Sequence, residues 1–189
     1  MGAWARLAGR LDVAFDAVLR WDDRTLHAVS RSRALQRYAR VFVTASFLGD
    51  GYLWGGLGLG LILFGRTPDR LNVLIGLGVS IVNVAVFRFV KVLFGRRRPE
   101  NGSGGGRLRT IDTYAFPSGH ATTSFGLAWL VAWTYPHPAA IAGVYLVAAT
   151  IAFSRIYVRE HYPSDVLFGA MLGTVTSAAL LPFFRWLFL

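Results

Sequence analysis

Three short blocks hold nearly every residue type that could perform chemistry in this chain. They read KVLFGRRRP (91–99), PSGH (117–120) and SRIYVREHYPSD (154–165), and the sequence around them is almost wholly apolar. Together they supply several cations, two histidines and carboxylates. That combination suits the transfer of a phosphoryl group, because fixed cations neutralise charge on the phosphate oxygens while histidine side chains attack phosphorus or move protons. We therefore take the three blocks as the candidate active site.

The candidate phosphate-binding groups are three cations and one helix end. Lys91, Arg98 and Arg155 supply the cations; arginine gives bidentate contacts to a phosphate, and lysine gives a compact point charge. Ser118 and Gly119 stand at the start of a predicted helix, where free N–H groups and the helix dipole favour an anion. Lys91 is the only lysine of the chain. Taken alone, that lysine is equally well explained as sequence drift at an exposed site.

The order and spacing of these residues resemble the signature of the type 2 phosphatidic acid phosphatase superfamily. This family includes lipid phosphatases, glucose-6-phosphatase and the vanadium haloperoxidases. The matching positions are Lys91, Arg98, Pro99, Pro117, Ser118, Gly119, His120, Ser154, Arg155, His161 and Asp165. The resemblance covers all three blocks, and each of these positions holds the residue that the signature specifies.

The resemblance implies a role for each matched histidine and for the aspartate. His161 would attack phosphorus to form a phosphohistidine, Asp165 would orient its ring, and His120 would protonate the leaving group. Asp165 stands four residues after His161, within reach if the turn between them is tight. A single interfacial histidine is more often structural, and we interpret His27 and His137, outside the blocks, as surface residues.

No metal ion or other cofactor is expected, because the three cations of the blocks would repel a divalent ion. The chain contains no cysteine, which excludes disulfides and thiolate metal sites. Its net charge of +10 would favour nucleic-acid binding in a soluble protein. Here the arginines lie at predicted helix ends, in loops and in the N-terminal segment, where lipid headgroups meet them. We therefore expect no nucleic-acid partner.

The apolar stretches predict an all-α polytopic membrane bundle. Hydrophobic residues make up 54% of the 189-residue chain, and several windows exceed the roughly 18 apolar residues that cross a bilayer. We predict about five transmembrane helices, over 41–64, 71–94, 118–135, 139–156 and 164–189. Alternating crossings would place the three blocks at the same membrane face. The chain then forms a single unit with an N-terminal arm (1–40) and a transmembrane phosphatase domain (41–189).

The arm has the pattern of a helix that lies in the membrane interface. Apolar residues recur at three- and four-residue steps, while charged residues fall mostly on another face; the apolar set is Trp4, Leu7, Leu11, Phe15 and Val18. Asp22 and Asp23 indicate the cap of a second short helix that ends near Val29. Packing of the arm against the bundle is an equally good interpretation.

Three features have no settled role in the sequence. Asp50 lies within Gly-Asp-Gly near the middle of 41–64, where a carboxylate is unfavourable unless it is paired or wet; a structural kink is the preferred interpretation over a functional one. The glycine-rich loop 95–116 suits a lid or a plain surface loop. Small residues in 41–60 suit helix packing within one bundle or between protomers, so a homo-oligomer stays open.

Together with the apolar stretches, the resemblance implies a metal-independent integral membrane lipid phosphatase. Its partners would be the bilayer and a phosphorylated membrane lipid: a polyprenyl diphosphate, phosphatidic acid or phosphatidylglycerol phosphate. The alternatives are a non-catalytic protein that binds or transports lipid phosphates and, against the predicted membrane spans, a vanadate-dependent haloperoxidase.

Arginine placement bears on orientation in what we expect to be a bacterial inner membrane. The arm carries eight arginines on the active-site side, whereas the other side has Arg66, Arg70 and Arg185. The positive-inside rule therefore favours a cytoplasmic active site, although most bacterial relatives are expected to act on the outer face.

Overall fold

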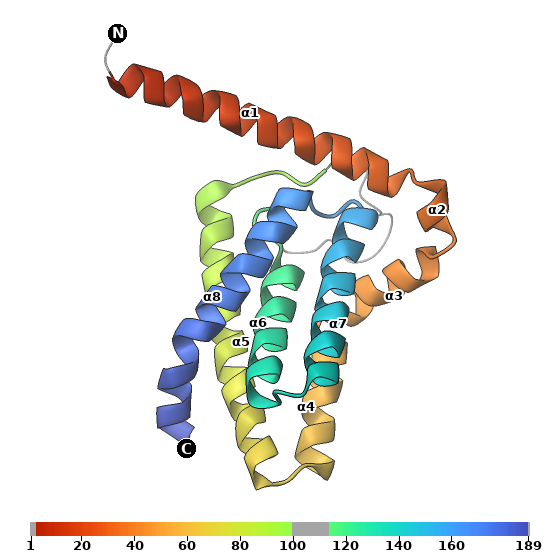
Figure 1. Cartoon of the computed structure of the whole chain (residues 1–189), viewed down its shortest axis with the longest axis vertical. Coiled ribbons are helices and arrows are strands. Elements are labelled where there is room, and N and C mark those ends of the chain that lie inside the picture. Colours follow the sequence, from red (N-terminus) through yellow and green to blue (C-terminus); the bar gives the residue numbers. More distant parts are fainter. Residues whose placement is uncertain (1–2, 100–113, 189) are drawn as a thin grey trace.

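The computed structural model describes residues 3–99 and 114–188, with side chains described from residue 9 onward. The described chain is all-α and contains no strand, as the sequence predicts. Its helices are α1 (Ala3–Ser30), α2 (Arg33–Gln36), α3 (Ala39–Leu48), α4 (Tyr52–Phe64), α5 (Thr67–Phe94), α6 (Gly119–Thr134), α7 (Pro138–Tyr157) and α8 (Pro163–Phe188). Helices α4 to α8 form a bundle, and α1 lies across one end of it and extends beyond it (Figure 1).

Helix α6 forms the centre of the bundle, where it packs against α5, α7 and α8. It approaches α8 closely because Gly173 has no side chain; a Cβ there would overlap the carbonyl oxygen of Thr122. A buried hydrogen bond from Asn83 Nδ2 to Ser177 Oγ, 3.0 Å long, joins α5 to α8. These contacts hold together α5, α6 and α8, the helices that carry or adjoin the three blocks.

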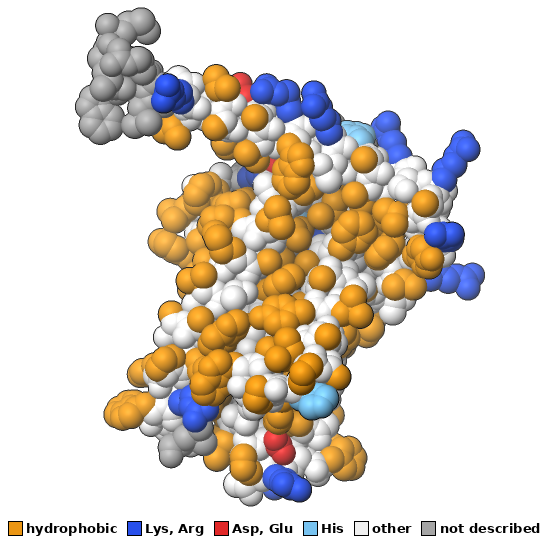
Figure 2. All heavy atoms as spheres, viewed as in Figure 1, with side chains coloured by type: hydrophobic (Ala, Val, Ile, Leu, Met, Phe, Trp, Pro, Cys, Tyr) orange, Lys and Arg blue, Asp and Glu red, His pale blue; other side chains and the backbone are white. Residues whose placement is uncertain are grey.

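The face of the bundle shown in Figure 2 is largely apolar, as a membrane protein requires. Among the described residues, three helices are long and apolar enough to cross a membrane, namely α5, α7 and α8, and α3 with α4 would make a fourth span if the bent pair is one. Helix α6 has 16 residues. The chain is thus a multi-pass membrane protein, and the count of five spans stays a prediction.

The helix predicted over 41–64 is broken, which the sequence pattern alone did not fix. Helices α3 and α4 meet at an angle of 60°. Gly51 adopts the left-handed conformation with φ 114°, which glycine tolerates. A Cβ on Gly49 would meet Ile151 at 2.5 Å and the His120 ring at 2.8 Å. Both glycines are therefore required by the bend, and the bend carries Asp50 to the candidate site.

The arm differs from the prediction of two helices. Helix α1 runs without a break to Ser30, and Asp22 is a buried residue within it rather than a cap. Leu26, which is 2% exposed, anchors this half of α1 in a cluster with residues of α6, α7 and α8. The other half extends beyond the bundle with Leu11 and Phe15 exposed. The C-terminal half therefore packs on the bundle, and binding of the rest to the membrane interface stays a prediction.

Candidate active site

The three blocks meet at one end of the bundle, as the sequence predicts. They come from the end of α5 with the segment after it, from the start of α6, and from the connection between α7 and α8. A cavity of about 740 Å³ opens there. Its polar end is lined by Asp50, Arg98, Gly119, His120 and His161.

His161 is held with one ring nitrogen committed to the protein. The side chain is 2% exposed, and its Nδ1 lies 2.7 Å from the carbonyl oxygen of Ala115. A carbonyl only accepts hydrogen bonds, so Nδ1 carries the proton and Nε2 keeps its lone pair. The ring lines the cavity. His161 thus has the tautomer that a nucleophile requires.

Asp165 lies near His161 but does not hold its ring directly. Its Oδ2 is 3.9 Å from Nδ1 of His161, beyond hydrogen-bond distance. Oδ2 instead accepts a 2.8 Å bond from the backbone N–H of Tyr162, and Oδ1 accepts one of 2.8 Å from Arg96. The carbonyl of Asp165 accepts the Ser118 N–H at 3.0 Å. Asp165 therefore fixes the connection that carries His161 rather than the imidazole itself.

The surroundings of His161 disfavour its protonated form. Burial, followed by the positive charges of Arg155 and Arg98, lowers the pKa of His161 well below its ordinary value of 6.5. The imidazole is consequently neutral at physiological pH, and its lone pair is available for attack.

This shift predicts that acid destabilises the fold through His161. Below pH 6.5 the unfolded chain takes a proton that the folded chain refuses, so stability from this residue is lost as pH falls. We expect the unfolding temperature in detergent to fall more for wild type than for His161→Asn between about pH 7.5 and about pH 5. Equal falls for the two proteins would contradict the shift.

The three predicted cations lie around His161. Two of them contact Glu160, a carboxylate that sequence reasoning missed. Lys91 is 3% exposed and donates to the Tyr114 carbonyl at 2.9 Å. Arg98 forms an ion pair with Glu160, which also lies 3.9 Å from Nη2 of Arg155. Glu160 precedes the predicted nucleophile and had no other distinguishing signal. Glu160 thus lies within ion-pair distance of two predicted phosphate-binding arginines, of which Arg98 lines the cavity.

Ser118 and Gly119 have different places at the start of α6. Ser118 is fully buried as the N-cap, where its Oγ accepts the Ala121 N–H at 3.4 Å. Gly119 lines the cavity, and a Cβ there would meet the Phe87 ring at 3.0 Å. Ser118 therefore caps the helix whose positive end faces the cavity at Gly119.

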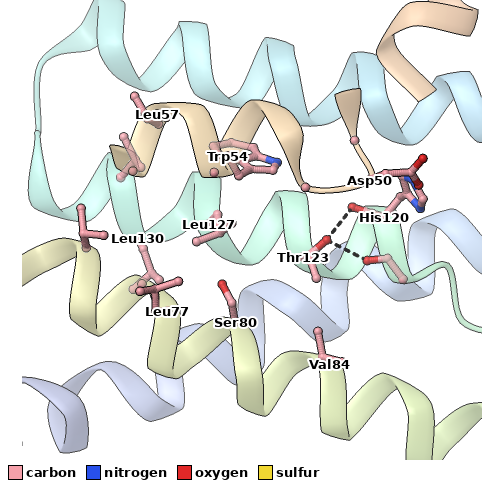
Figure 3. Close-up of a pocket in the computed structure, with 18 of the residues that line it drawn as sticks. Asp50, Trp54, Leu57, Leu77, Ser80, Val84, His120, Thr123, Leu127 and Leu130 are labelled. Carbon is pink, nitrogen blue, oxygen red and sulfur yellow. Dashed lines mark hydrogen bonds and ion pairs between the residues drawn. The ribbon is translucent and has the colours of Figure 1, made fainter. Parts of the chain in front are cut away.

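Asp50 meets His120 at the cavity wall (Figure 3). Its Oδ1 lies 2.8 Å from Nε2 of His120. The interpretation of Gly-Asp-Gly as a purely structural kink was therefore incomplete, because the kink also delivers a carboxylate to the predicted general acid. A carboxylate at this distance can orient the ring of the predicted general acid.

Removing that carboxylate should slow proton transfer from His120. We expect Asp50→Asn to lower kcat for a lipid substrate about tenfold at neutral pH, because the ring of His120 would lose the carboxylate that lies 2.8 Å from its Nε2. Asp69→Asn makes the same change in the first turn of α5, at the end of that helix that lies away from the site, and should alter stability rather than chemistry. Steady-state kinetics of both variants and of wild type make the comparison. If Asp50→Asn and Asp69→Asn have the same kcat, Asp50 has no role in the mechanism.

Beyond the polar end, the cavity continues as an apolar groove between α4, α5 and α6 (Figure 3). Leucine and valine side chains line it, and Trp54 fixes one wall through a 3.1 Å hydrogen bond from Nε1 to Ser124 Oγ. The lining reaches Tyr135, one helix length from Gly119. With a rise of about 1.5 Å per residue, that distance is roughly 24 Å.

Comparison with known proteins decides the family. Residues 71–188 match the profile of the PAP2 superfamily. The chain belongs to the PAP2 superfamily. The sequence resemblance is thereby confirmed, and the match contains all three blocks.

Curated PAP2 relatives match part of the chain. A lipid A 4'-phosphatase of Bacteroides thetaiotaomicron is 30% identical over 115 residues, which cover 53% of this chain and 48% of the relative. A decaprenylphosphoryl-5-phosphoribose phosphatase of Mycobacterium tuberculosis is 31% identical over 103 residues, 54% and 55% of the two chains. An undecaprenyl-diphosphatase of Sulfolobus acidocaldarius is 30% identical over 138 residues, 71% and 65%. The first two matches span about half of each relative's length.

Two solved structures share the PAP2 fold with this chain. LpxE of Aquifex aeolicus superposes with a TM-score of 0.68 at 22% identity, covering 86% of this chain and 95% of the other. A transmembrane PAP2-type phosphatidylglycerolphosphate phosphatase of Bacillus subtilis gives a TM-score of 0.67 at 22% identity, covering 90% and 87%. At this identity the likeness concerns the fold, and it agrees with the all-α membrane bundle predicted from the sequence.

Proposed function

We propose that this PAP2 chain hydrolyses a phosphate ester or diphosphate of a membrane lipid through a phosphohistidine on His161. The observation that carries the proposal is the state of that residue. Its Nδ1 is committed to the Ala115 carbonyl at 2.7 Å, and the ring lines the cavity that it shares with Arg98 and His120. A neutral imidazole with a free Nε2 lone pair beside fixed cations is suited to attack phosphorus.

The reaction would proceed in two displacements. First, Nε2 of His161 bonds to phosphorus while the bond from phosphorus to the leaving oxygen breaks, and His120 gives that oxygen a proton. Water then attacks the phosphohistidine, the N–P bond breaks, and a water proton returns to His120. Arg98, which lines the cavity, would balance the charge on the phosphoryl oxygens in both steps, and Arg155 and Lys91, which do not line it, would add positive charge from behind the cavity wall.

The groove between α4, α5 and α6 supports a lipid as the substrate. Its apolar wall suits a hydrocarbon chain, while the phosphate reaches the polar end of the same cavity. The named activities of the relatives include polyprenyl and lipid A phosphates. The candidate substrates are polyprenyl diphosphates, phosphatidylglycerol phosphate and phosphatidic acid. A bacterial inner membrane with the site on its cytoplasmic side, as the arginines indicate, is part of the proposal.

Phosphate release by the purified chain in detergent tests the activity. The substrates would be undecaprenyl diphosphate, phosphatidylglycerol phosphate and phosphatidic acid, each with and without a chelator. We expect release from at least one lipid and the same rate with chelator, because fixed cations occupy the role that a metal would take. Loss of activity with chelator would contradict the metal-independent mechanism. No release by the folded wild type from any lipid, with binding retained, would favour a lipid-binding or transport protein.

A further inference from the structure

A carboxylate of the arm lies at the centre of a buried polar network beside the active site. Asp22 of α1 is 0% exposed. Its Oδ1 accepts the Ser164 N–H at 2.8 Å, and its Oδ2 accepts the Ser164 hydroxyl at 2.5 Å and Nη2 of Arg96 at 2.7 Å. Ser164 stands at the start of α8, next to Asp165. Asp22 therefore connects the arm to the helix that carries Asp165.

Arg96 continues the network to Asp165 with its second terminal nitrogen. Nη1 donates to Asp165 Oδ1 at 2.8 Å and to Ser164 Oγ at 2.8 Å, while the guanidinium carbon lies 4.2 Å from the centre of the Tyr162 ring. The planar fork of arginine thus bridges two buried carboxylates that would otherwise repel one another. Lysine offers a single ammonium and cannot reproduce this bridge in the same geometry.

Asp165 links the network to both histidine-bearing segments. Its side chain accepts the N–H of Tyr162, which follows His161, and its carbonyl accepts the N–H of Ser118, which begins the segment of His120. Displacement of Asp165 would therefore move the predicted nucleophile and the predicted acid relative to one another. A shift of about 1 Å between reacting groups is enough to lower a rate about a hundredfold.

We propose that Asp22 and Arg96 are positioning residues through which the N-terminal arm completes the active site. The proposal rests on the proposed phosphatase function, since its effect is on the rate of that reaction. Neither residue lines the cavity, so both act through Asp165 rather than on the substrate. Leu26, four residues after Asp22, anchors the same stretch of α1 in the apolar cluster. Packing of the arm on the bundle therefore also sets the positions of the active-site residues.

The test compares variants of the full chain by kcat, KM and unfolding temperature. Asp22→Asn keeps the side-chain shape but sets an amide against Arg96; we expect kcat to fall about tenfold with KM changed by less than about twofold. Arg96→Gln leaves two buried carboxylates facing each other and should lower kcat about a hundredfold. The kcat of Arg96→Lys should lie between those of wild type and Arg96→Gln.

Two controls separate positioning from stability. Asp23→Asn removes the adjacent, exposed carboxylate of the same helix and should match wild type. The double variant with Asp22→Asn and Arg96→Gln should lose no more kcat than Arg96→Gln alone, because both changes break one connection. Each kcat is calculated per folded molecule, with the folded fraction taken from the unfolding curve. A residue with a role in folding alone would therefore leave kcat unchanged.

The outcomes distinguish this inference from the proposed function. If wild type releases phosphate but Asp22→Asn matches Asp23→Asn in kcat, the positioning role is wrong and the phosphatase proposal stands. Additive losses in the double variant, or a loss confined to KM, would also overturn it. If wild type releases no phosphate from any lipid, the proposed function fails first, and the inference falls with it.

Discussion

His161→Asn should abolish turnover, with kcat lowered at least about 10⁴-fold, because removing the nucleophile of a covalent mechanism removes the reaction path itself. Asparagine can still donate a hydrogen bond toward the Ala115 carbonyl, so the fold should be retained. The cations and the groove are untouched by this change, and lipid binding should persist. Phosphate release and lipid binding, measured on the same preparation, would show the two effects separately.

His137→Asn is the matched control for this loss. His137 is exposed at the turn before α7, outside the three blocks. The same chemical change there should leave kcat within about twofold of wild type. If His161→Asn retained a tenth of the wild-type kcat, the phosphohistidine mechanism would be wrong, and water activated by another group would have to attack phosphorus.

The second large effect concerns the leaving group. His120→Gln should lower kcat about 10²- to 10⁴-fold on a lipid phosphate, whose alkoxide leaves poorly without a proton. On p-nitrophenyl phosphate the leaving phenolate is stable without protonation, so the same variant should lose far less. The ratio of the two losses measures general-acid catalysis, which a purely structural histidine would not produce.

The position of His120 supports this expectation. It lies at the second residue of α6, lines the cavity, and has Asp50 at 2.8 Å. Equal losses on both substrates would contradict the acid role and indicate that His120 binds the phosphate instead. Thr123→Ala, also on the cavity wall, provides the control for packing, and the two substrates should respond to it equally.

Local sequence patterns predicted the helices and the meeting of the blocks well. The apolar periods gave α5 to α8 within a few residues, because each is a long run with turn residues at its ends. Alternating crossings then required the blocks to share one end of the bundle, and they do. These features depend on neighbours in the chain, so the sequence carries them directly.

Long-range contacts between polar residues were not predictable in the same way. Arg96 binds Asp22 across 74 residues and Asp165 across 69, and nothing in the run 96–98 distinguished it from Arg97. Asp22 has the sequence context of a helix cap, yet tertiary packing extends α1 through it. The pairing of Asp50 with His120 likewise follows from a bend whose direction is set by packing against α7. Spacing placed Asp165 near His161 but could not specify that Ala115 would accept the Nδ1 hydrogen bond.

A rapid-quench experiment with substrate labelled on its reacting phosphate tests the central claim most directly. Wild type, mixed with a labelled lipid and quenched with alkali during the first turnover, should carry label on His161 that is stable to base and released by acid. His161→Asn should carry none. The test uses conditions in which wild type releases the lipid product before it releases phosphate. If wild type turns over under these conditions but carries no label at any time in the first turnover, the phosphohistidine mechanism is contradicted.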